Sequence, residues 1–326
     1  MGRIGCAFFT IVLLIAGAGA GGFLWLSGQY EKPGPLTEET TVVVPKGAGV
    51  QAIAQTLADA GVIDSPLVFR AGARIQDVDA ALRAGEYAFP AGISAADVVA
   101  LLSSGKTVVR RMTVPEGLTT AQVLELVAET PGLTGSVGPP PGEGTLLPET
   151  YHFSLGDSRA DLIARMREAM EAELDKAWAA RAPGLPLETP AQAVVLASII
   201  EKETAVDAER RRVAAVFINR LRKDMLLQSD PTTIYAVTAG SGPLNRPLTR
   251  KDLAVESPYN TYVSPGLPPG PIANPGSASL AAALNPIESN EFYFVADGTG
   301  GHAFARTLEQ HERNVARWRK IRDESR

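Results

Sequence analysis

The sequence predicts an α+β protein with an N-terminal membrane helix, a small βααβ module and a larger mixed α/β domain. Three observations support this fold class. A run of 23 residues, Ile4–Leu26, carries no charge. A strand, a Pro-x-Gly turn and a helix are then predicted three times between residues 41 and 127. Beyond residue 144, helical patterns alternate with loops rich in proline and glycine, and a short hairpin is expected near the C-terminus.

The composition is that of an ordinary globular chain. The 326 residues are 45% hydrophobic and 21% charged, which excludes wholesale disorder and suffices for about two domains. The formal net charge of −5 leaves no basic excess, so nucleic acid is not expected as a partner. A single cysteine excludes an intramolecular disulfide. The histidines lack the spacing of metal ligands and no phosphate loop is present, so neither a metal nor a cofactor is expected.

The first thirty residues are expected to anchor the chain in the cytoplasmic (inner) membrane. About 20 apolar residues span a bilayer as a helix, and Ile4–Leu26 meets this length. Arg3 precedes the run, so the positive-inside rule places the N-terminus in the cytoplasm and everything after Tyr30 outside, in the periplasmic or extracytoplasmic space. A cleaved signal peptide, with small residues at Ala16–Ala20, is the alternative, although the apolar run continues past that point.

One small pattern recurs three times in the next hundred residues. Pro45–Gly47, Pro90–Gly92 and Pro115–Gly117 each follow a run of strand composition, and apolar residues lie six and ten positions after each glycine. Proline cannot extend the strand, and glycine gives the turn its conformational freedom. Apolar residues four positions apart share one helix face. Each copy therefore predicts a strand, a turn and a helix.

The first two copies enclose a module of βααβ order. Strands over Thr41–Val44 and Glu86–Phe89 are expected to flank helices over Val50–Ala60 and Pro66–Ile75. This order and size are those of a LysM module, a small glycan-binding fold, and a generic α+β spacer is the alternative. We divide the chain into a tip and anchor at 1–30, a LysM-like region at 31–130 and a C-terminal domain at 131–326, with a Gly/Pro-rich hinge at 131–144.

The strongest chemical signal lies at the end of a buried helix that begins at Thr189. Thr189 and Gln192 have the spacing of a capping box, and Ala193–Ile200 is apolar apart from Ser198. Glu201 follows on the face of Ser198. Burial and the helix dipole would raise the pKa of its carboxyl, and a carboxylic acid that stays protonated near neutral pH can act as a general acid.

Two observations limit this interpretation of Glu201. Glu203 lies two positions further on, so both carboxylates cannot line one site if the helix continues. A glutamate at the end of a buried helix is also commonly paired with a cation, and Arg210–Arg212 and Arg220 are available in the next predicted helix, Ala208–Lys223.

A proline-stiffened loop, Pro258–Gly276, carries Tyr259, Asn260 and Tyr262. Aromatic rings stack on pyranoses and amides bond to hydroxyl groups, so this loop is a candidate sugar-binding wall, with a rigid structural loop as the alternative. Further on, strands are expected over 292–296 and 303–306, followed by a helix from residue 307.

Several motifs, in this order, resemble those of the YceG-like endolytic murein transglycosylases. The resemblance covers essentially the whole chain and is strongest between about Gly142 and Trp318. An upstream motif has Leu147 and Glu149 where the family more often has Phe and Asp. The segments that carry the resemblance are Glu143–Tyr151, Ala197–Thr204, Val216–Leu221, Leu227–Thr232, Tyr259–Tyr262, Gly266–Ile272 and Tyr293–Gly298.

The resemblance implies cleavage of peptidoglycan glycan strands at the β-1,4 bond between N-acetylmuramic acid and N-acetylglucosamine. The product is a 1,6-anhydromuramic end, so the reaction is a lyase reaction that consumes no water. The family's catalytic glutamate maps onto Glu201, as acid for the leaving oxygen and then as base for the C6 hydroxyl. The residues expected to line the sugar site are Glu149, Asn219, Gln228, Ser229, Asp230, Tyr259, Asn260 and Tyr262.

Two other functions stay open on the sequence. A water-using muramidase would need a second carboxylate, such as Asp230 or Glu149. A non-catalytic glycan-binding scaffold would use the anchor and the LysM-like region to organise the wall synthesis machinery. The resemblance also implies that the enzyme terminates nascent strands beside membrane-bound wall synthases, which are therefore candidate partners.

Overall fold

The computed structural model describes residues 2–324, and in the first helix it describes side chains only at Phe9 and from Leu13 onward. The chain forms two compact units. One ends at Arg110 and includes Ser154–Gly156, and the other holds Arg111–Phe153 and the chain from Asp157 onward. The division therefore falls at Arg110 and not within the hinge placed at 131–144.

Helix α1 spans Gly2–Glu31. Tyr30, near its end, is buried against Gly72, where an added Cβ would lie 2.1 Å from the tyrosine ring. Within the described residues, no helix combines the length and the apolar character needed to cross a membrane. The side chains of Arg3 and Cys6 lie outside the described residues. The anchor over residues 4–26 stays a prediction.

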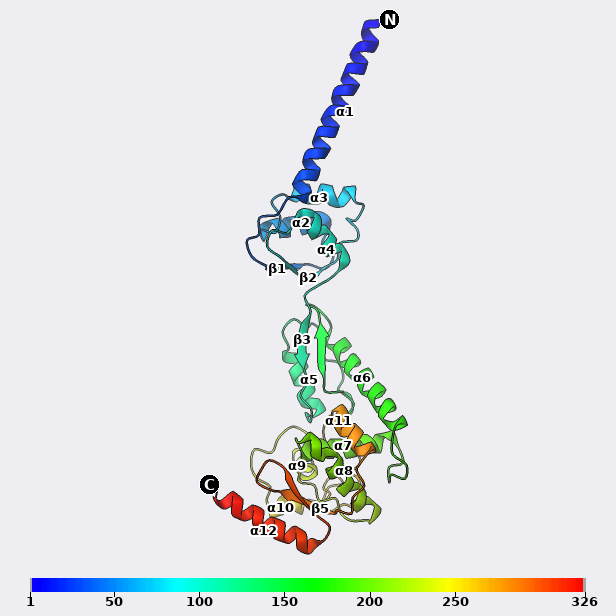
Figure 1. The fold of residues 1–326 in the computed structure, drawn as a ribbon, viewed down its shortest axis with the longest axis vertical. Helices are drawn as coiled ribbons and strands as arrows, with labels where there is room; N and C mark the ends of the chain where they lie inside the picture. Colours follow the sequence, from blue (N-terminus) through cyan, green and yellow to red (C-terminus); the bar gives the residue numbers. More distant parts are fainter. Residues whose placement is uncertain (1, 325–326) are drawn as a thin grey trace. The chain divides into compact units, whose positions relative to one another are not determined.

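The first unit contains β1 (Thr40–Val44), α2 (Val50–Asp59), α3 (Pro66–Ile75), β2 (Gly85–Phe89) and α4 (Ala95–Ser104) (Figure 1). Strands β1 and β2 are antiparallel, and the helices enclose a core that contains the fully buried rings of Phe69, Tyr87 and Phe89. The predicted βααβ order is confirmed. The likeness of this unit to a LysM module stays a prediction.

The three Pro-x-Gly turns form as predicted. Gly47, Gly92 and Gly117 have φ angles of 77°, 68° and 75°, in the left-handed region that favours glycine. Each turn leads from a strand into a helix, and the third helix begins with a capping box between Thr119 and Gln122.

The third copy of the pattern packs into the second unit. It consists of β3 (Arg110–Thr113) and α5 (Thr120–Glu129), and it is followed by β4 (Thr150–Phe153) and α6 (Arg159–Ala179). Strand β3 pairs with β4. A separate apolar core joins these elements, which is why the unit begins before the hinge. Its buried members include Met112, Val114, Val123, Val127, Leu146, Phe153, Leu162 and Met166.

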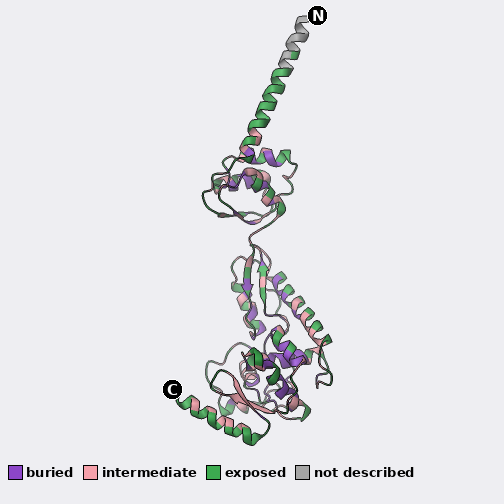
Figure 2. Cartoon of the chain, viewed as in Figure 1, coloured by how far each residue is buried: buried purple, intermediate pink, exposed green. Residues whose placement is uncertain are grey.

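The larger core of the second unit surrounds α7 (Pro190–Glu203). Every residue from Ala193 to Ile200 is buried, as Figure 2 shows for the helix, and α7 packs against α8 (Asp207–Arg222) and α11 (Ser277–Leu284). The predicted capping box between Thr189 and Gln192 is present.

Short elements complete this unit around α7 and α8. They are α9 (Asp230–Thr238), α10 (Arg250–Leu253), β5 (Tyr293–Ala296), β6 (His302–Ala305) and α12 (Leu308–Glu324). Strands β5 and β6 form the predicted antiparallel hairpin, with Phe294 opposite Phe304. The result is a mixed α/β unit whose sheets have only two strands each in the described chain.

Candidate functional site

The two glutamates in the last turn of α7 face different surroundings. The Glu201 side chain is only 5% exposed. The backbone N–H of Gly276 donates a hydrogen bond to its Oε2 at 2.9 Å, and Nη2 of Arg210 lies 3.7 Å from its Oε1. Glu201 therefore has an arginine partner, which is the structural alternative that the sequence left open.

Arg210, itself almost completely buried, gathers further carboxylates around Glu201. Glu116 Oε2 lies 3.6 Å from the guanidinium, and Asp207 is in direct contact with it. Burial, together with the charge of Glu201, raises the pKa of Glu116. Lys202 donates from Nζ to the carbonyl of Gly117 at 3.1 Å. This ion-pair network ties the end of α7 to α8 and to the turn that precedes α5.

Glu203 instead lies in an open cleft of about 440 Å³. Helices α7, α8, α9 and α12, the hairpin of β5 and β6, and the loop after α10 all contribute to its wall. The lining residues are Glu203, Arg220, Leu227, Gln228, Asp230, Tyr262, Phe294, Val295, Ala296, His302, His311 and Val315.

The surroundings of Glu203 favour the protonated form of its carboxyl group. Burial is the largest influence, and with the neighbouring charge of Asp230 it raises the pKa of Glu203 to about 7. The hydroxyl of Ser229, which donates to Oε1 of Glu203, acts in the opposite direction, as do the positive charge of Arg220 and that of His302 when its ring is protonated. This carboxyl can therefore carry a proton near neutral pH and give it to a substrate oxygen.

The loop that carries Ser229 is held in an unusual backbone conformation. Gln228 has a φ angle of 52°, which is costly for a residue with a side chain. Its N–H donates to the carbonyl of Thr261, and the N–H of Ser229 donates to the hydroxyl of Thr261. These bonds aim the Ser229 hydroxyl, which is itself buried, at Glu203.

Arg220 and Tyr262 shape the polar floor of the cleft. The Arg220 guanidinium donates to the carbonyls of Phe292 (2.6 Å) and Leu227 (2.9 Å), and burial lowers its pKa. The Tyr262 hydroxyl donates to Oδ1 of Asp230 at 2.6 Å, and burial raises the pKa of that phenol. Asp230 is thereby fixed beside Glu203.

Four of the predicted sugar-site residues gather with Glu203, namely Gln228, Ser229, Asp230 and Tyr262. Asn260 lies behind them and is fully buried. Its amide donates to the carbonyls of Leu253 and Val255, and its Oδ1 accepts from Thr233, so it shapes the loop from beneath.

Three predicted residues, Glu149, Tyr259 and Asn219, lie elsewhere in the second unit. Glu149 is exposed next to β4, where its carboxylate accepts from the N–H of Thr150. Tyr259 packs on Tyr235 with ring centroids 4.9 Å apart. The structure does not bring either residue to the cleft, because the motifs that carry them support other parts of the core.

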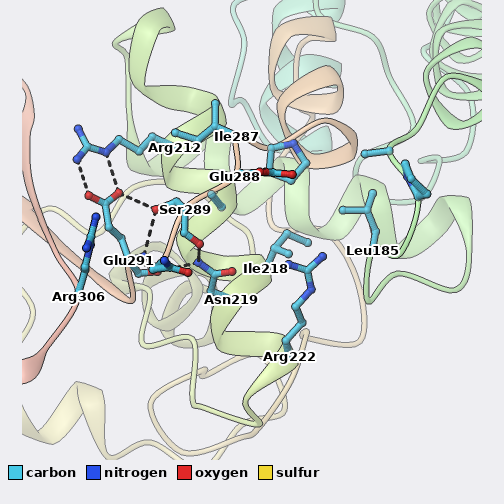
Figure 3. Close-up of a pocket in the computed structure, with 15 residues that line it drawn as sticks. Leu185, Arg212, Ile218, Asn219, Arg222, Ile287, Glu288, Ser289, Glu291 and Arg306 are labelled. Atoms are coloured by element: carbon cyan, nitrogen blue, oxygen red, sulfur yellow. Dashed lines mark hydrogen bonds and ion pairs between the residues drawn. The ribbon is translucent and has the colours of Figure 1, made fainter.

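Asn219 lines a different pocket, of about 890 Å³, on another face of α8 (Figure 3). Its amide donates to the carbonyls of Ser289 (2.8 Å) and Glu291 (3.0 Å). Glu291 in turn pairs with Arg212 through two hydrogen bonds (Figure 3). Asn219 thus fixes the segment before β5 and does not face Glu203.

Arg220, His302 and His311 also line the cleft, although the sequence patterns did not predict them there. The sequence indicated Arg220 only as an ion-pair partner, and the histidines only lack the spacing of metal ligands. Within residues 2–324, no group of three histidine, cysteine or acidic side chains is placed to hold a metal ion. The signal that could have found His302 is its position after the Gly-rich turn of the predicted hairpin.

Comparison with known families identifies the family to which the chain belongs. The profile of the YceG-like family matches residues 42–317. The chain belongs to the YceG-like family. A crystal structure of a putative YceG-like protein from Listeria monocytogenes matches this YceG-like protein with a TM-score of 0.53 and 33% identity, over 85% of this chain and 99% of that chain.

Curated relatives of this YceG-like protein are named endolytic murein transglycosylases. The protein from Bacillus subtilis strain 168 is 31% identical over 342 residues, which cover 92% of this chain and 90% of that protein. The protein from Streptococcus pneumoniae strain D39 is 29% identical over 94% of this chain. The alignment spans 64% of the length of that pneumococcal relative.

Proposed function

We propose that this YceG-like protein is a lytic transglycosylase that cleaves glycan strands of peptidoglycan between N-acetylmuramic acid and N-acetylglucosamine and leaves 1,6-anhydro ends. The observation that carries the proposal is Glu203, a carboxyl with a pKa of about 7 in an open polar cleft. The names of the curated relatives support the same reaction.

Glu203 is the general acid in this proposal. Its proton passes to the glycosidic oxygen as the bond from that oxygen to C1 of the muramic residue breaks. The C6 hydroxyl oxygen of the same sugar forms a new bond to C1, so the sugar supplies its own nucleophile and no water is consumed. The proton of the C6 hydroxyl passes to a base in the cleft, either the carboxylate that Glu203 has become or a second group.

Glu203 replaces Glu201, the predicted acid, in this proposal. The Glu201 carboxyl is already bound by the Gly276 N–H and lies beside the Arg210 guanidinium, both of which stabilise its charged form. A general acid needs the opposite environment. Glu203 has it, because burial and the charge of Asp230 outweigh the Ser229 hydrogen bond.

Neighbouring side chains suit a sugar ring whose C1 becomes positive in the transition state. Asp230 supplies a fixed negative charge beside Glu203, and Tyr262 holds its orientation. Such preorganised charge lowers the barrier without rearrangement during the reaction. Gln228 is exposed at the edge of the cleft, where its amide oxygen accepts from Arg220 and its amide N–H groups can meet sugar hydroxyl groups.

Product analysis tests this function directly. Purified glycan strands are incubated with the full-length protein or with its Glu203→Gln variant, and the products are identified by mass spectrometry. We expect 1,6-anhydro ends from the wild type and none from the variant. Anhydro ends from both proteins in equal amounts would overturn the role of Glu203, and intact strands in both would overturn the activity.

A water-using muramidase is the second candidate function, and the position of Asp230 favours it. Two carboxylates in one cleft are the usual equipment of a glycosidase that uses water. Glu149, the other predicted second carboxylate, is not in the cleft. The same product analysis separates the candidates, because a muramidase leaves reducing ends in place of anhydro ends.

We also propose that residues 4–26 anchor the protein in the cytoplasmic membrane, with both folded units outside the cytoplasm. The apolar run and Arg3 before it support this topology. Wall synthases are then partners, and cleavage of nascent strands terminates their elongation. Co-purification of synthases from membranes with the full chain, but not with a chain lacking residues 1–30, is the expected result. Equal recovery with both would contradict an anchor-dependent contact.

A further inference from the structure

A histidine and a glutamate that the reaction above does not use form a dyad in the cleft. His302 is the first residue of β6, and Glu209 lies in the first turn of α8. Nδ1 of His302 is 2.7 Å from Oε2 of Glu209, and the backbone N–H of His302 donates to Oε1 of Glu209 at 3.0 Å. The carboxylate therefore holds both the ring and the main chain of His302.

The geometry of the dyad is built into the hairpin between β5 and β6. Gly301 precedes His302, and a Cβ at this position would lie 2.8 Å from Oε1 of Glu209. The glycine thus allows the carboxylate to approach the main chain. The imidazole also meets the ring of Phe294 edge-on, with centroids 5.3 Å apart and planes at 89°. The ring is consequently held in one orientation.

These contacts select one tautomer of the neutral imidazole. A carboxylate only accepts hydrogen bonds, so Nδ1 carries the proton and Nε2 keeps its lone pair. No described residue forms a hydrogen bond with Nε2, and the His302 side chain is 15% exposed. Because His302 lines the same cleft as Glu203, the free lone pair is available to a molecule bound there.

We propose that His302, oriented by Glu209, is the base that takes the proton of the C6 hydroxyl, while Glu203 acts only as the acid. The inference rests on the proposed transglycosylase function. It explains how acid and base can act together: a protonated Glu203 cannot accept a proton before it has given its own away, whereas a neutral imidazole can.

The step balances without any external reactant. The C6 hydroxyl proton moves to Nε2 as the oxygen bonds to C1, and the proton of Glu203 moves to the leaving oxygen as the glycosidic bond breaks. His302 is then an imidazolium paired with Glu209, and Glu203 is a carboxylate. Transfer of one proton from His302 to Glu203 restores both groups for the next cycle.

The pH profile of the enzyme reports the protonation of the acid, Glu203. Glu209 and Glu203 face the imidazole from α8 and α7, and the other titratable groups that line the cleft are Asp230, Arg220, Tyr262 and His311. The base must be neutral and the acid must be protonated. We therefore expect activity to fall at alkaline pH, where Glu203 loses its proton.

Kinetics of the full-length protein on glycan strands tests the dyad. We expect His302→Gln to lower kcat by about 10²- to 10³-fold with KM nearly unchanged, and to leave the alkaline limb that Glu203 sets in place. In His302→Ala, added imidazole should restore part of the lost rate, which a purely structural role would not allow. Glu209→Gln should cost about 10-fold. The control is His152→Gln, on the exposed surface of β4, which should behave as wild type.

Distinct outcomes overturn the dyad and the proposed function. Wild-type anhydro products that disappear in Glu203→Gln but persist at full rate in His302→Gln would overturn the role of His302 alone. A His302→Ala variant that imidazole does not restore would do the same. Absence of anhydro products from the wild type would overturn the function itself.

Discussion

The two sides of the last turn of α7 offer opposite environments to the same kind of side chain. Glu201 is buried beside Arg210 and accepts a backbone hydrogen bond, within a network that joins α7, α8 and the turn before α5. Glu203, two residues later, is partly buried beside Asp230, with a serine hydroxyl as its hydrogen-bond donor. One side offers the carboxylate a cation and a backbone donor, and the other raises the pKa of the carboxyl.

The difference shows that burial alone does not identify a catalytic acid. A buried carboxylate with a cation and a backbone donor is a structural element, because its charge is compensated. A buried carboxyl that faces another negative charge keeps its proton. The charge and hydrogen-bond donors of the neighbours decide which role a glutamate can take.

Neutral replacement of each glutamate should give the largest contrast. Glu203→Gln should lower turnover of glycan strands by about 10³-fold, because it removes the transferable proton. Glu201→Gln should lower turnover by less than about 10-fold and act mainly on stability. Single-turnover rates and thermal midpoints of both variants check this. A folded Glu201→Gln variant that is slower than Glu203→Gln would contradict the different roles of the two glutamates.

Removal of the Arg210 guanidinium should destabilise the surroundings of Glu201 and leave those of Glu203 unchanged. Arg210→Met leaves Glu201 and Glu116 buried without their partner, so the free energy of unfolding should fall by about 3–5 kcal/mol. Denaturant titrations measure it, and Arg222→Met, at an exposed position of the same helix, is the matched control. A loss no larger than that of the control would mean that the ion-pair network contributes little.

The stability that the protonated Glu203 carboxyl contributes should instead fall as pH rises. The pKa of this carboxyl rises from 4.5 to about 7 on folding, so between these values the unfolded state loses a proton that the folded state keeps. The stability contributed by the proton is fully present below pH 4.5 and is lost by about pH 7. The loss is at most about 3 kcal/mol. Glu203→Gln should remove this part of the pH dependence.

Unfolding free energies of wild type and Glu203→Gln at acidic and at mildly alkaline pH measure that effect. The variant should gain stability relative to the wild type on the alkaline side. A difference between the two proteins that is the same at both pH values would contradict a raised pKa at this position.

Removal of the Ser229 hydroxyl should give the smallest effect. The hydrogen bond from Ser229 stabilises the charged form of Glu203, so Ser229→Ala should raise the pKa of Glu203 further. The alkaline limb of the activity profile should then move to higher pH, by about one unit or less. A movement to lower pH would show that the serine stabilises the protonated form. Thr232→Ser, in the first turn of the helix that follows Ser229, is a conservative control.

Much of the fold could be predicted from local patterns. The three Pro-x-Gly turns, the capping box at Thr189 and the hairpin of β5 and β6 depend on residues close together in sequence, and all are present. The end of the first unit could not be found in this way. It depends on the apolar core that α5 shares with β4 and α6, which are distant in sequence.

The candidate site was predictable only in part for the same reason. The motif around Ser229 and Asp230 indicated a polar site, and the spacing of Glu201 and Glu203 indicated that they face different sides. Which side holds the cleft depends on Arg210 and Gly276 meeting Glu201, and on the loop of Ser229 meeting Glu203. Helix periodicity does not contain these long-range contacts, nor the pairing of His302 with Glu209.

The titration of the Glu203 carboxyl tests the central claim most directly. Carboxyl carbon signals of protein labelled at glutamate can be followed by NMR across the pH range, and the signal absent from Glu203→Gln identifies the group. We predict a midpoint of about 7 for that signal. A midpoint near the ordinary glutamate value of about 4.3 would contradict the assignment of Glu203 as the acid.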